Sequence, residues 1–227
     1  DSTYAEVEGY TTSEHVVGQA LDRVIGDAPG RVLVATFASL ISRIQQVITA
    51  AVKYDRKVAV VGRSMRNNVN MALSMGYLDV PKGTVISINE ARQLPHEQVV
   101  IVATGSQGEP TSALVRIANG EHQDIVIVPG DTVVISASPI PGNETVISKT
   151  IDNLLRQEAT VLYSAIALVH VHGHASQEEL KLMLNLVRPK YFVPVHGEYR
   201  HLMAHAALAR ATGISEDNAF VLEDGDV

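Results

Sequence analysis

The chain of 227 residues carries a formal net charge of −7, and 46% of its residues are hydrophobic, enough for a substantial core in one large or two small domains. The absence of cysteine excludes disulfides and thiolate zinc sites and fits the cytoplasm, and neither a membrane-spanning run nor a signal peptide is evident. The acidic balance argues against a generally basic nucleic-acid surface, so nucleic acid would need a local cluster of donors.

Apolar runs of strand length alternate with segments of helical spacing over the first two thirds of the chain. We expect strands over residues 31–37, 57–61, 84–88, 98–103, 125–128 and 133–136. We expect helices over residues 13–25, 41–54, 67–75, 111–118 and 143–156. Strands that alternate with helices of this length form parallel βαβ units, which predicts an α/β fold with a mostly parallel sheet.

The next region has the pattern of a strand, a tight turn and a helix. Residues 165–171 form a short apolar run of strand length, and Gly173 allows the chain to turn sharply. Ser176 is expected to cap the following helix, because Glu179 lies three positions later at the spacing of a capping box.

The same arrangement is repeated further along the chain. Residues 191–195 predict a strand that ends before His196, and a helix is expected from about Tyr199. If this strand and the one before His174 are parallel neighbours, both imidazoles lie at one edge of a sheet, where α/β proteins commonly bind ligands. Residues 219–222 are expected to form a final strand.

Seven short motifs occur in order along the whole chain. They are DST at 1–3, TFAS at 36–39, GRSM at 62–65, ATGSQGEP at 103–110, PIPGNE at 139–144, GHASQEELKLML at 173–184 and FVPVHGEYRH at 192–201. In sequence and in order they resemble the β-CASP branch of the metallo-β-lactamase nucleases, and within it most closely the ribonuclease J family.

The resemblance implies a division into two parts. Residues 1–160 are similar to the β-CASP domain, which in this family is inserted into the metallo-β-lactamase domain. Residues 161–227 are similar to the returning, C-terminal segment of that domain. A chain that starts on a motif aspartate, without an initiator methionine, is expected to be a piece of a longer protein.

Asp1, His174 and His196 match residues with functional roles in the family. There the counterpart of His174 donates to an oxygen of the scissile phosphate, and the counterpart of Asp1 orients that histidine and favours its protonated form. The counterpart of His196 is a metal ligand. These roles suit the chemistry of imidazole. Without the resemblance, the two histidines would equally suit structural hydrogen bonds at strand ends, and Asp1 would be a solvated terminus.

Most of the family's metal ligands have no counterpart in this sequence. The resemblance implies two Zn²⁺ ions in the full-length enzyme, bound largely by a His-x-His-x-Asp-His cluster that this chain lacks. Because His196 alone cannot hold two ions, we expect the chain by itself to be metal-free and inactive. A metal site on the alternating residues His170, His172 and His174 stays open as an alternative.

Several small-residue loops follow predicted strands and offer N–H, hydroxyl and guanidinium donors to phosphate. Ordinary βα turns have the same composition, so the assignment rests on the resemblance, which places such loops along an RNA channel and a pocket for the 5′-terminal monophosphate. The candidate phosphate- or RNA-binding residues are Arg63, Ser64, Gly105, Ser106, Ser136, Ser138 and Ser176.

The resemblance implies a cytoplasmic, metal-dependent ribonuclease that cleaves single-stranded RNA by endonucleolytic or 5′–3′ exonucleolytic hydrolysis, with homo-oligomer formation left open. The alternative is a non-catalytic module that binds RNA or nucleotide phosphates. Leu40, Ser42 and His172 depart from the family pattern and indicate altered RNA handling or a divergent member. His201 and His205 lie four apart on a predicted helix and are expected on the surface.

Overall fold

Six parallel strands form one sheet in the order β3-β2-β4-β1-β5-β6. Their bounds are β1 Val32–Ala35, β2 Lys57–Val61, β3 Val85–Ile86, β4 Val99–Ala103, β5 Thr132–Ile135 and β6 Thr160–Tyr163. The predicted α/β fold with a parallel sheet is therefore confirmed. All carboxyl ends of the strands lie at one edge, and this edge carries the loops that the sequence singled out.

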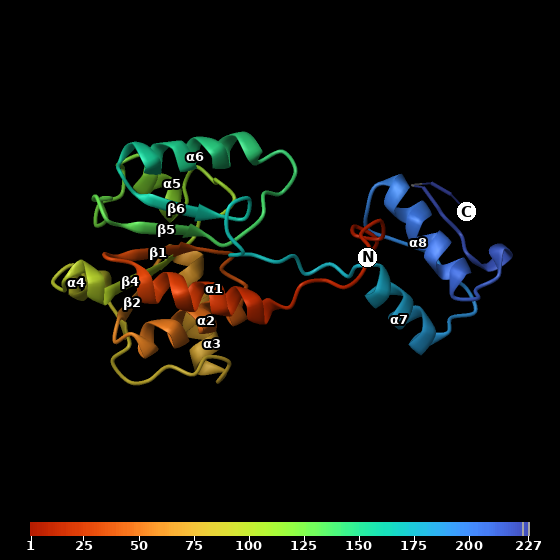
Figure 1. Cartoon of the computed structure of the whole chain (residues 1–227), viewed down its shortest axis with the longest axis horizontal. Coiled ribbons are helices and arrows are strands. Elements are labelled where there is room, and N and C mark those ends of the chain that lie inside the picture. The colour runs from red at the N-terminus through yellow and green to blue at the C-terminus, as the bar shows by residue number, and fades with distance from the viewer. Residues whose placement is uncertain (224, 227) are drawn as a thin grey trace. The chain divides into compact units, whose positions relative to one another are not determined.

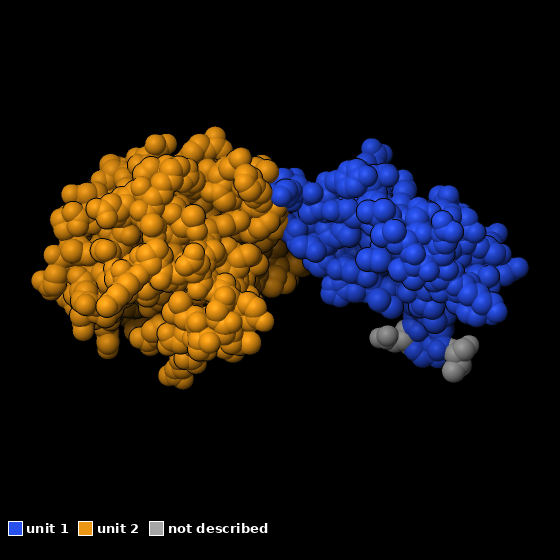
Figure 2. Space-filling model, turned by 90° about the horizontal axis from the view of Figure 1, so that it is seen from below, with its two compact units in different colours: residues 1–13, 172–227 blue, residues 14–171 orange. Residues whose placement is uncertain are grey.

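The computed structural model describes residues 1–223, 225 and 226. The chain forms two compact units, coloured separately in Figure 2. The sheet unit comprises residues 14–171, and the histidine unit comprises residues 1–13 together with residues 172–227. The sequence-based division at residue 160 stays a prediction, whereas the first thirteen residues belong to the same compact unit as the C-terminal segment.

Helices cover both faces of the sheet (Figure 1). They are α1 Glu14–Asp27, α2 Ile41–Lys53, α3 Arg63–Ser74, α4 Ile88–Ala91, α5 Ala113–Ala118 and α6 Glu144–Arg156, with a short 3-10 helix η1 at His96–Gln98. Helices α1, α2 and α3 share one core cluster with Val32 and Val34, whereas α5 and α6 share the other with Leu33 and Ala35. Alternate residues of β1 therefore face opposite layers, as the pleat of a strand requires.

Helix α3 begins four residues earlier than the sequence predicts. Gly62 precedes it with a φ of +101°, and a Cβ at Gly62 would lie 2.5 Å from the Thr104 hydroxyl oxygen. Glycine thus lets the chain turn from β2 directly into the helix. As a result, Arg63 and Ser64 occupy the first helical turn, where backbone N–H groups lack intrahelical partners.

Three predictions about strands in the sheet unit need correction. The expected strand over residues 84–88 is reduced to β3, because Ser87 and Glu90 form a capping box that starts α4. Residues 125–128 and 165–171 are not strands, although Ile125 and Val169 are buried in the core. Strand β6, which the sequence did not predict, occupies the edge position beside β5 instead.

The histidine unit contains helices α7 Gln177–Val187 and α8 Tyr199–Ala211 and a 3-10 helix η2 at Glu216–Asn218. Ser176 caps α7, and the Glu179 carboxylate accepts from the Ser176 N–H at 2.8 Å, which confirms the predicted capping box. The strands expected over residues 191–195 and 219–222 are reduced to a single parallel bridge between Phe192 and Ala219. None of the helices in the described residues is long and apolar enough to cross a membrane.

Candidate functional site

The side chains of Asp1 and His174 form a hydrogen-bonded pair in the histidine unit. Asp1 Oδ2 lies 2.5 Å from His174 Nδ1, and the two side chains are 42% and 35% exposed. Asp1 Oδ1 also accepts the Thr3 N–H at 3.0 Å, which fixes the carboxylate in a local turn. Because Nδ1 faces the carboxylate, the Nε2 atom is the ring nitrogen of His174 that Asp1 does not engage.

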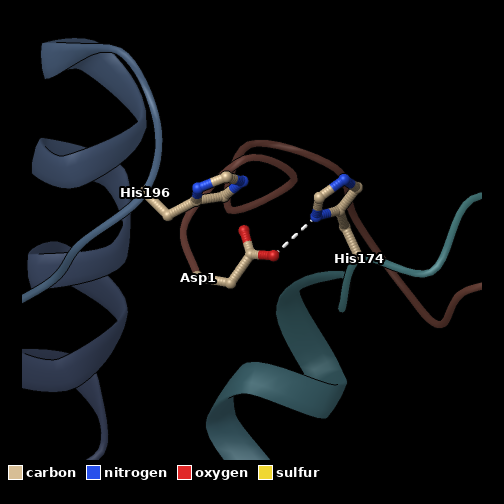
Figure 3. Close-up of side chains that lie close together, drawn as sticks. All are labelled: Asp1, His174 and His196. Atoms are coloured by element: carbon tan, nitrogen blue, oxygen red, sulfur yellow. Dashed lines mark hydrogen bonds and ion pairs between the residues drawn. The ribbon is translucent and has the colours of Figure 1, made fainter.

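His196 lies beside this pair, with its ring centroid 5.8 Å from that of His174 and an angle of 20° between the rings. Figure 3 shows the Asp1 carboxylate between the two imidazoles. The backbone of His196 has a φ of +60°, which is uncommon for a residue other than glycine. Its carbonyl accepts the Ser2 N–H at 2.9 Å, so the segment that carries Asp1 also holds this conformation.

The backbone before α7 is fixed in the same manner. The His174 carbonyl accepts the Thr11 hydroxyl at 2.8 Å, and His172 Nδ1 lies 3.0 Å from the same carbonyl oxygen. The His172 ring stacks on Tyr4 at 3.6 Å between centroids. His172, one of the three departures from the family pattern, therefore supports the His174 loop. Residues 165–171 do not form the strand that would place His170 and His172 on one face.

The donor set of this cluster fits a divalent metal. Asp1, His174 and His196 each offer one ligand atom, and these atoms lie within 4.8 Å of one another. Imidazole nitrogen and carboxylate oxygen are donors that zinc binds in proteins. Within the part of the chain that the structure describes, these are the residues that come together as such a group.

His205 is buried, contrary to the expectation that it lies on the surface. It is 6% exposed and packs edge-on against Phe192, with 4.8 Å between ring centroids. Burial, together with the ammonium group at the start of the chain, lowers the pKa of His205 to about 4. At neutral pH the ring is therefore uncharged, with one hydrogen-bond donor and one acceptor.

We expect the chain to lose stability between pH 6.5 and pH 5 because of His205. Its folded-state pKa of about 4 lies below the ordinary value of 6.5, so the unfolded chain binds the proton first as the pH falls. The free energy of unfolding should fall by about 1.5 kcal/mol over this range, before most carboxylates titrate. Thermal unfolding of the parent and of a His205→Asn variant at both pH values measures the contribution of His205 to this loss of stability. Equal decreases in the two proteins would refute it.

A second group of candidate residues lies at the carboxyl edge of the sheet. A pocket of about 690 Å³ is lined there by Arg63, Ser64, Arg66, Thr104, Glu109, Thr111, Ser112 and Arg116. Arg63 and Arg66 form no ion pair within the described part of the chain. The pocket therefore offers guanidinium and hydroxyl donors, partly offset by the Glu109 carboxylate, and suits an anionic group such as phosphate.

The other predicted phosphate-binding residues are used differently. Gly105 has a φ of +110°, and a Cβ there would lie 2.4 Å from the Ser112 hydroxyl oxygen, so the turn after β4 requires glycine. Ser106 is 3% exposed, while Ser138 is exposed and its carbonyl accepts the Gln107 amide at 2.9 Å. Ser176 is 1% exposed and belongs to the histidine unit.

Ser136 belongs to a buried network that the sequence reasoning missed. The Arg43 guanidinium, which is fully buried in α2, donates to the Ser136 hydroxyl, to the Val169 carbonyl at 2.9 Å and to the Glu14 carboxylate at 2.6 Å. The Ser136 hydroxyl in turn donates to Val169 at 2.6 Å. The Ser136 hydroxyl is therefore already bonded to Arg43 and Val169, and its role in phosphate binding stays a prediction. The available signal in the sequence was Arg43 itself, the one arginine of the helix predicted over residues 41–54, which lies next to the apolar positions of that helix.

Comparisons with known proteins match most of the chain to two family models. Residues 29–154 match the family model of the ribonuclease J β-CASP domain, and residues 160–221 match that of the Zn-dependent metallo-hydrolase RNA specificity domain. This chain belongs to the ribonuclease J family. The family is one that uses a divalent metal, in agreement with the donor set around His174.

Named ribonuclease J proteins align with the whole chain, including Asp1, which precedes both matched regions. The relative from Thermus thermophilus is 52% identical and that from Synechocystis sp. is 51% identical, each over 227 residues. Ribonuclease J 1 from Streptococcus pyogenes is 48% identical over 227 residues. These alignments cover 100% of this chain but only 39%, 36% and 40% of the relatives, so the chain spans well under half of their length.

Proposed function

We propose that this chain is part of a longer, metal-dependent ribonuclease that hydrolyses phosphodiester bonds in single-stranded RNA, by endonucleolytic cleavage, 5′–3′ exonucleolytic cleavage or both. The observation that carries the proposal is the Asp1–His174 pair beside His196, in a chain that matches ribonuclease J relatives from end to end. The inserted β-CASP part would then contribute to binding of RNA, and the histidine unit would contribute to the reaction.

In this proposal His174 is the catalytic proton donor. Its Nδ1–H donates to the Asp1 carboxylate at 2.5 Å, which sets the orientation of the ring. When both ring nitrogens carry a proton, Nε2–H can donate to a phosphate oxygen as negative charge develops there. Asp1 acts on the substrate only through His174, by holding the ring and stabilising its positive charge.

His196 is the proposed metal ligand of this chain. A divalent metal, when bound, supplies positive charge that activates water and stabilises the developing charge on the phosphate. The positive φ of His196, held by the Ser2 N–H, directs the imidazole to the same place as Asp1 and His174. We infer two Zn²⁺ ions in the full-length enzyme, with the remaining ligands supplied by other parts of that protein.

The 227-residue chain by itself is expected to be metal-free and not to hydrolyse RNA. Its described residues offer one group of three ligand side chains, of which His174 and Asp1 already pair with each other. The test is incubation of the purified chain with single-stranded RNA and Zn²⁺, Mn²⁺ or Mg²⁺. Reproducible metal-dependent hydrolysis that disappears in a His196→Ala variant would refute the expectation.

The arginine-lined pocket of the sheet unit favours a second candidate function, phosphate binding without catalysis. Arg63, Arg66 and Arg116 line it together in a chain whose net charge is −7, so that local donors rather than overall charge must attract RNA. The first turn of α3 adds backbone N–H groups beside Arg63. The proposed ligand of this pocket is a phosphate of single-stranded RNA, including the 5′-terminal monophosphate.

Replacement of Arg63 by alanine should weaken binding of a nucleoside 5′-monophosphate roughly fivefold, the loss expected for one partly exposed charge-assisted contact. Affinity should also fall with added salt. Isothermal titration of the 227-residue chain measures both effects, with Arg23→Ala as a control because Arg23 is an exposed arginine on α1 outside the pocket. A crystal soaked with the same nucleotide would contradict the site if its phosphate lay elsewhere.

Two further properties remain predictions from the sequence. A location in the cytoplasm is supported by the absence of cysteine, which suits a reducing compartment. Homo-oligomer formation is a prediction for the full-length protein.

A further inference from the structure

Ser2 and His205 form a buried polar pair beside the catalytic residues. Ser2 is fully buried and His205 is 6% exposed, and the Ser2 hydroxyl oxygen lies 2.9 Å from His205 Nδ1. Buried polar groups are costly unless they are paired, so this contact is a defined feature of the interior. Neither residue belongs to the proposed metal or proton-transfer groups.

The direction of the hydrogen bonds follows from the partners. The Ser2 hydroxyl donates to the Val195 carbonyl at 2.9 Å, because a carbonyl oxygen can only accept. A hydroxyl has one hydrogen, so towards His205 the Ser2 oxygen must act as the acceptor. His205 therefore carries its hydrogen on Nδ1, and the chain of donation runs from His205 to Ser2 to Val195.

The same serine also holds the loop of the proposed metal ligand. Its backbone N–H donates to the His196 carbonyl at 2.9 Å, and the Thr3 hydroxyl lies 3.4 Å from that carbonyl oxygen. His196 adopts a positive φ, and residues in such conformations persist only where their surroundings fix them. Ser2 thus ties the residue next to Asp1 to both Val195 and His196.

We propose that His205 and Ser2 are positioning residues that set the place of Asp1 relative to the His196 loop. Helix α8 carries His205, so this helix becomes the fixed support of the amino-terminal segment. We call the hydrogen bonds from His205 through Ser2 to Val195 the relay. With the relay intact, Asp1 Oδ2 lies 2.5 Å from His174 Nδ1, and the ring centroids of His196 and His174 are 5.8 Å apart. The inference rests on the proposed function, because it assigns Asp1, His174 and His196 to the reaction.

The test uses the full-length ribonuclease at saturating zinc. Ser2→Ala and His205→Leu should each lower kcat for RNA by about 10- to 100-fold, the usual effect of removing a partner that orients a reacting group, with KM changed less than about twofold. His205→Asn should retain kcat within about fivefold, since its amide N–H can replace Nδ1–H. The Ser2→Ala, His205→Leu double variant should lose no more kcat than the less active of the two single variants, because both changes break the same relay.

The control variant is His96→Leu, which removes an exposed histidine from the sheet unit and should leave kcat unchanged. If Ser2→Ala and His205→Leu fold and keep full kcat while His174→Ala is inactive, the relay is refuted and the proposed function stands. Additive losses in the double variant, or losses in melting temperature alone with unchanged kcat per folded enzyme, also overturn it. Full activity of His174→Ala instead overturns the proposed function itself. Where His205→Leu does not fold, Ser2→Ala decides the outcome, because full kcat in this variant alone refutes the relay.

Discussion

Replacement of His174 by alanine in the full-length ribonuclease is expected to lower kcat by roughly 10²- to 10⁴-fold, the range for loss of a positioned proton donor. The imidazole is held at 2.5 Å from Asp1, so its removal deletes the donor without deleting the proposed metal ligand His196. Metal content should therefore stay nearly unchanged. Single-turnover hydrolysis of RNA and elemental analysis of the purified variant measure the two quantities.

The matched comparison is His196→Ala in the same protein. This variant should lose bound metal as well as activity, because the His196 imidazole is the side chain assigned to the metal, whereas His174 is hydrogen-bonded to Asp1. Full metal content and full activity in both variants would show that the two roles are wrongly assigned. Loss of metal in His174→Ala alone would exchange the roles of the two histidines.

Replacement of Arg43 by alanine should lower the free energy of unfolding of the sheet unit by about 3 kcal/mol or more. The fully buried guanidinium donates to Glu14, Ser136 and Val169, and its removal leaves these acceptors without their charged donor and opens a cavity. For a unit of this size the melting temperature should fall by about 6–12 °C. Scanning calorimetry of the 227-residue chain measures the change.

Arg23→Ala is the control for this experiment. Arg23 is exposed on α1, and its Nε–H donates to the Gln19 carbonyl of the same helix over a long distance of 3.4 Å. Its replacement should change the melting temperature by about 1–2 °C at most. A comparable small effect of Arg43→Ala would contradict the view that the network around Ser136 is a structural support of the edge where β5 ends.

The sheet could be predicted because its strands carry their signal locally. Strands β1, β4 and β5 are buried throughout, and their sequences are therefore apolar apart from Thr132 at the start of β5. Helices α2 and α6 have clear apolar stripes, so their bounds differ from the predicted ranges by one residue or less. The capping box of Ser176 and Glu179 was readable for the same reason, since both residues lie within one turn.

Other features depend on partners that are distant in the sequence. Residues 191–195 have the composition of a strand, but a strand also needs a neighbour, and in the described residues of the histidine unit the pairing is one bridge at Phe192. Residues 165–171 of the sheet unit have the same composition, but they are not part of the six-stranded sheet. Arg43 meets Ser136 and Val169 across 93 and 126 positions. The burial of His205 was hidden because α8 is rich in alanine and has no distinct apolar stripe to orient it.

The convergence of Asp1, His174 and His196 was expected from their motifs, although not from the strands assumed to carry them. The structure places all three in one unit through loops and hydrogen bonds. The candidate phosphate residues did not converge in the same way. Arg63 and Ser64 share one pocket, whereas Ser136 and Ser176 are buried in separate networks. The motifs predicted that Asp1, His174 and His196 come together, and only the fold shows which serine hydroxyls are already hydrogen-bonded within the protein.

Hydrolysis of a 5′-monophosphorylated single-stranded RNA by the full-length protein, measured with and without a chelator, tests the central proposal most directly. We predict cleavage that stops on removal of metal, returns with added Zn²⁺ and is lost in the His174→Ala variant. Binding of the RNA without cleavage under all of these conditions would contradict the proposal and would favour the phosphate-binding module.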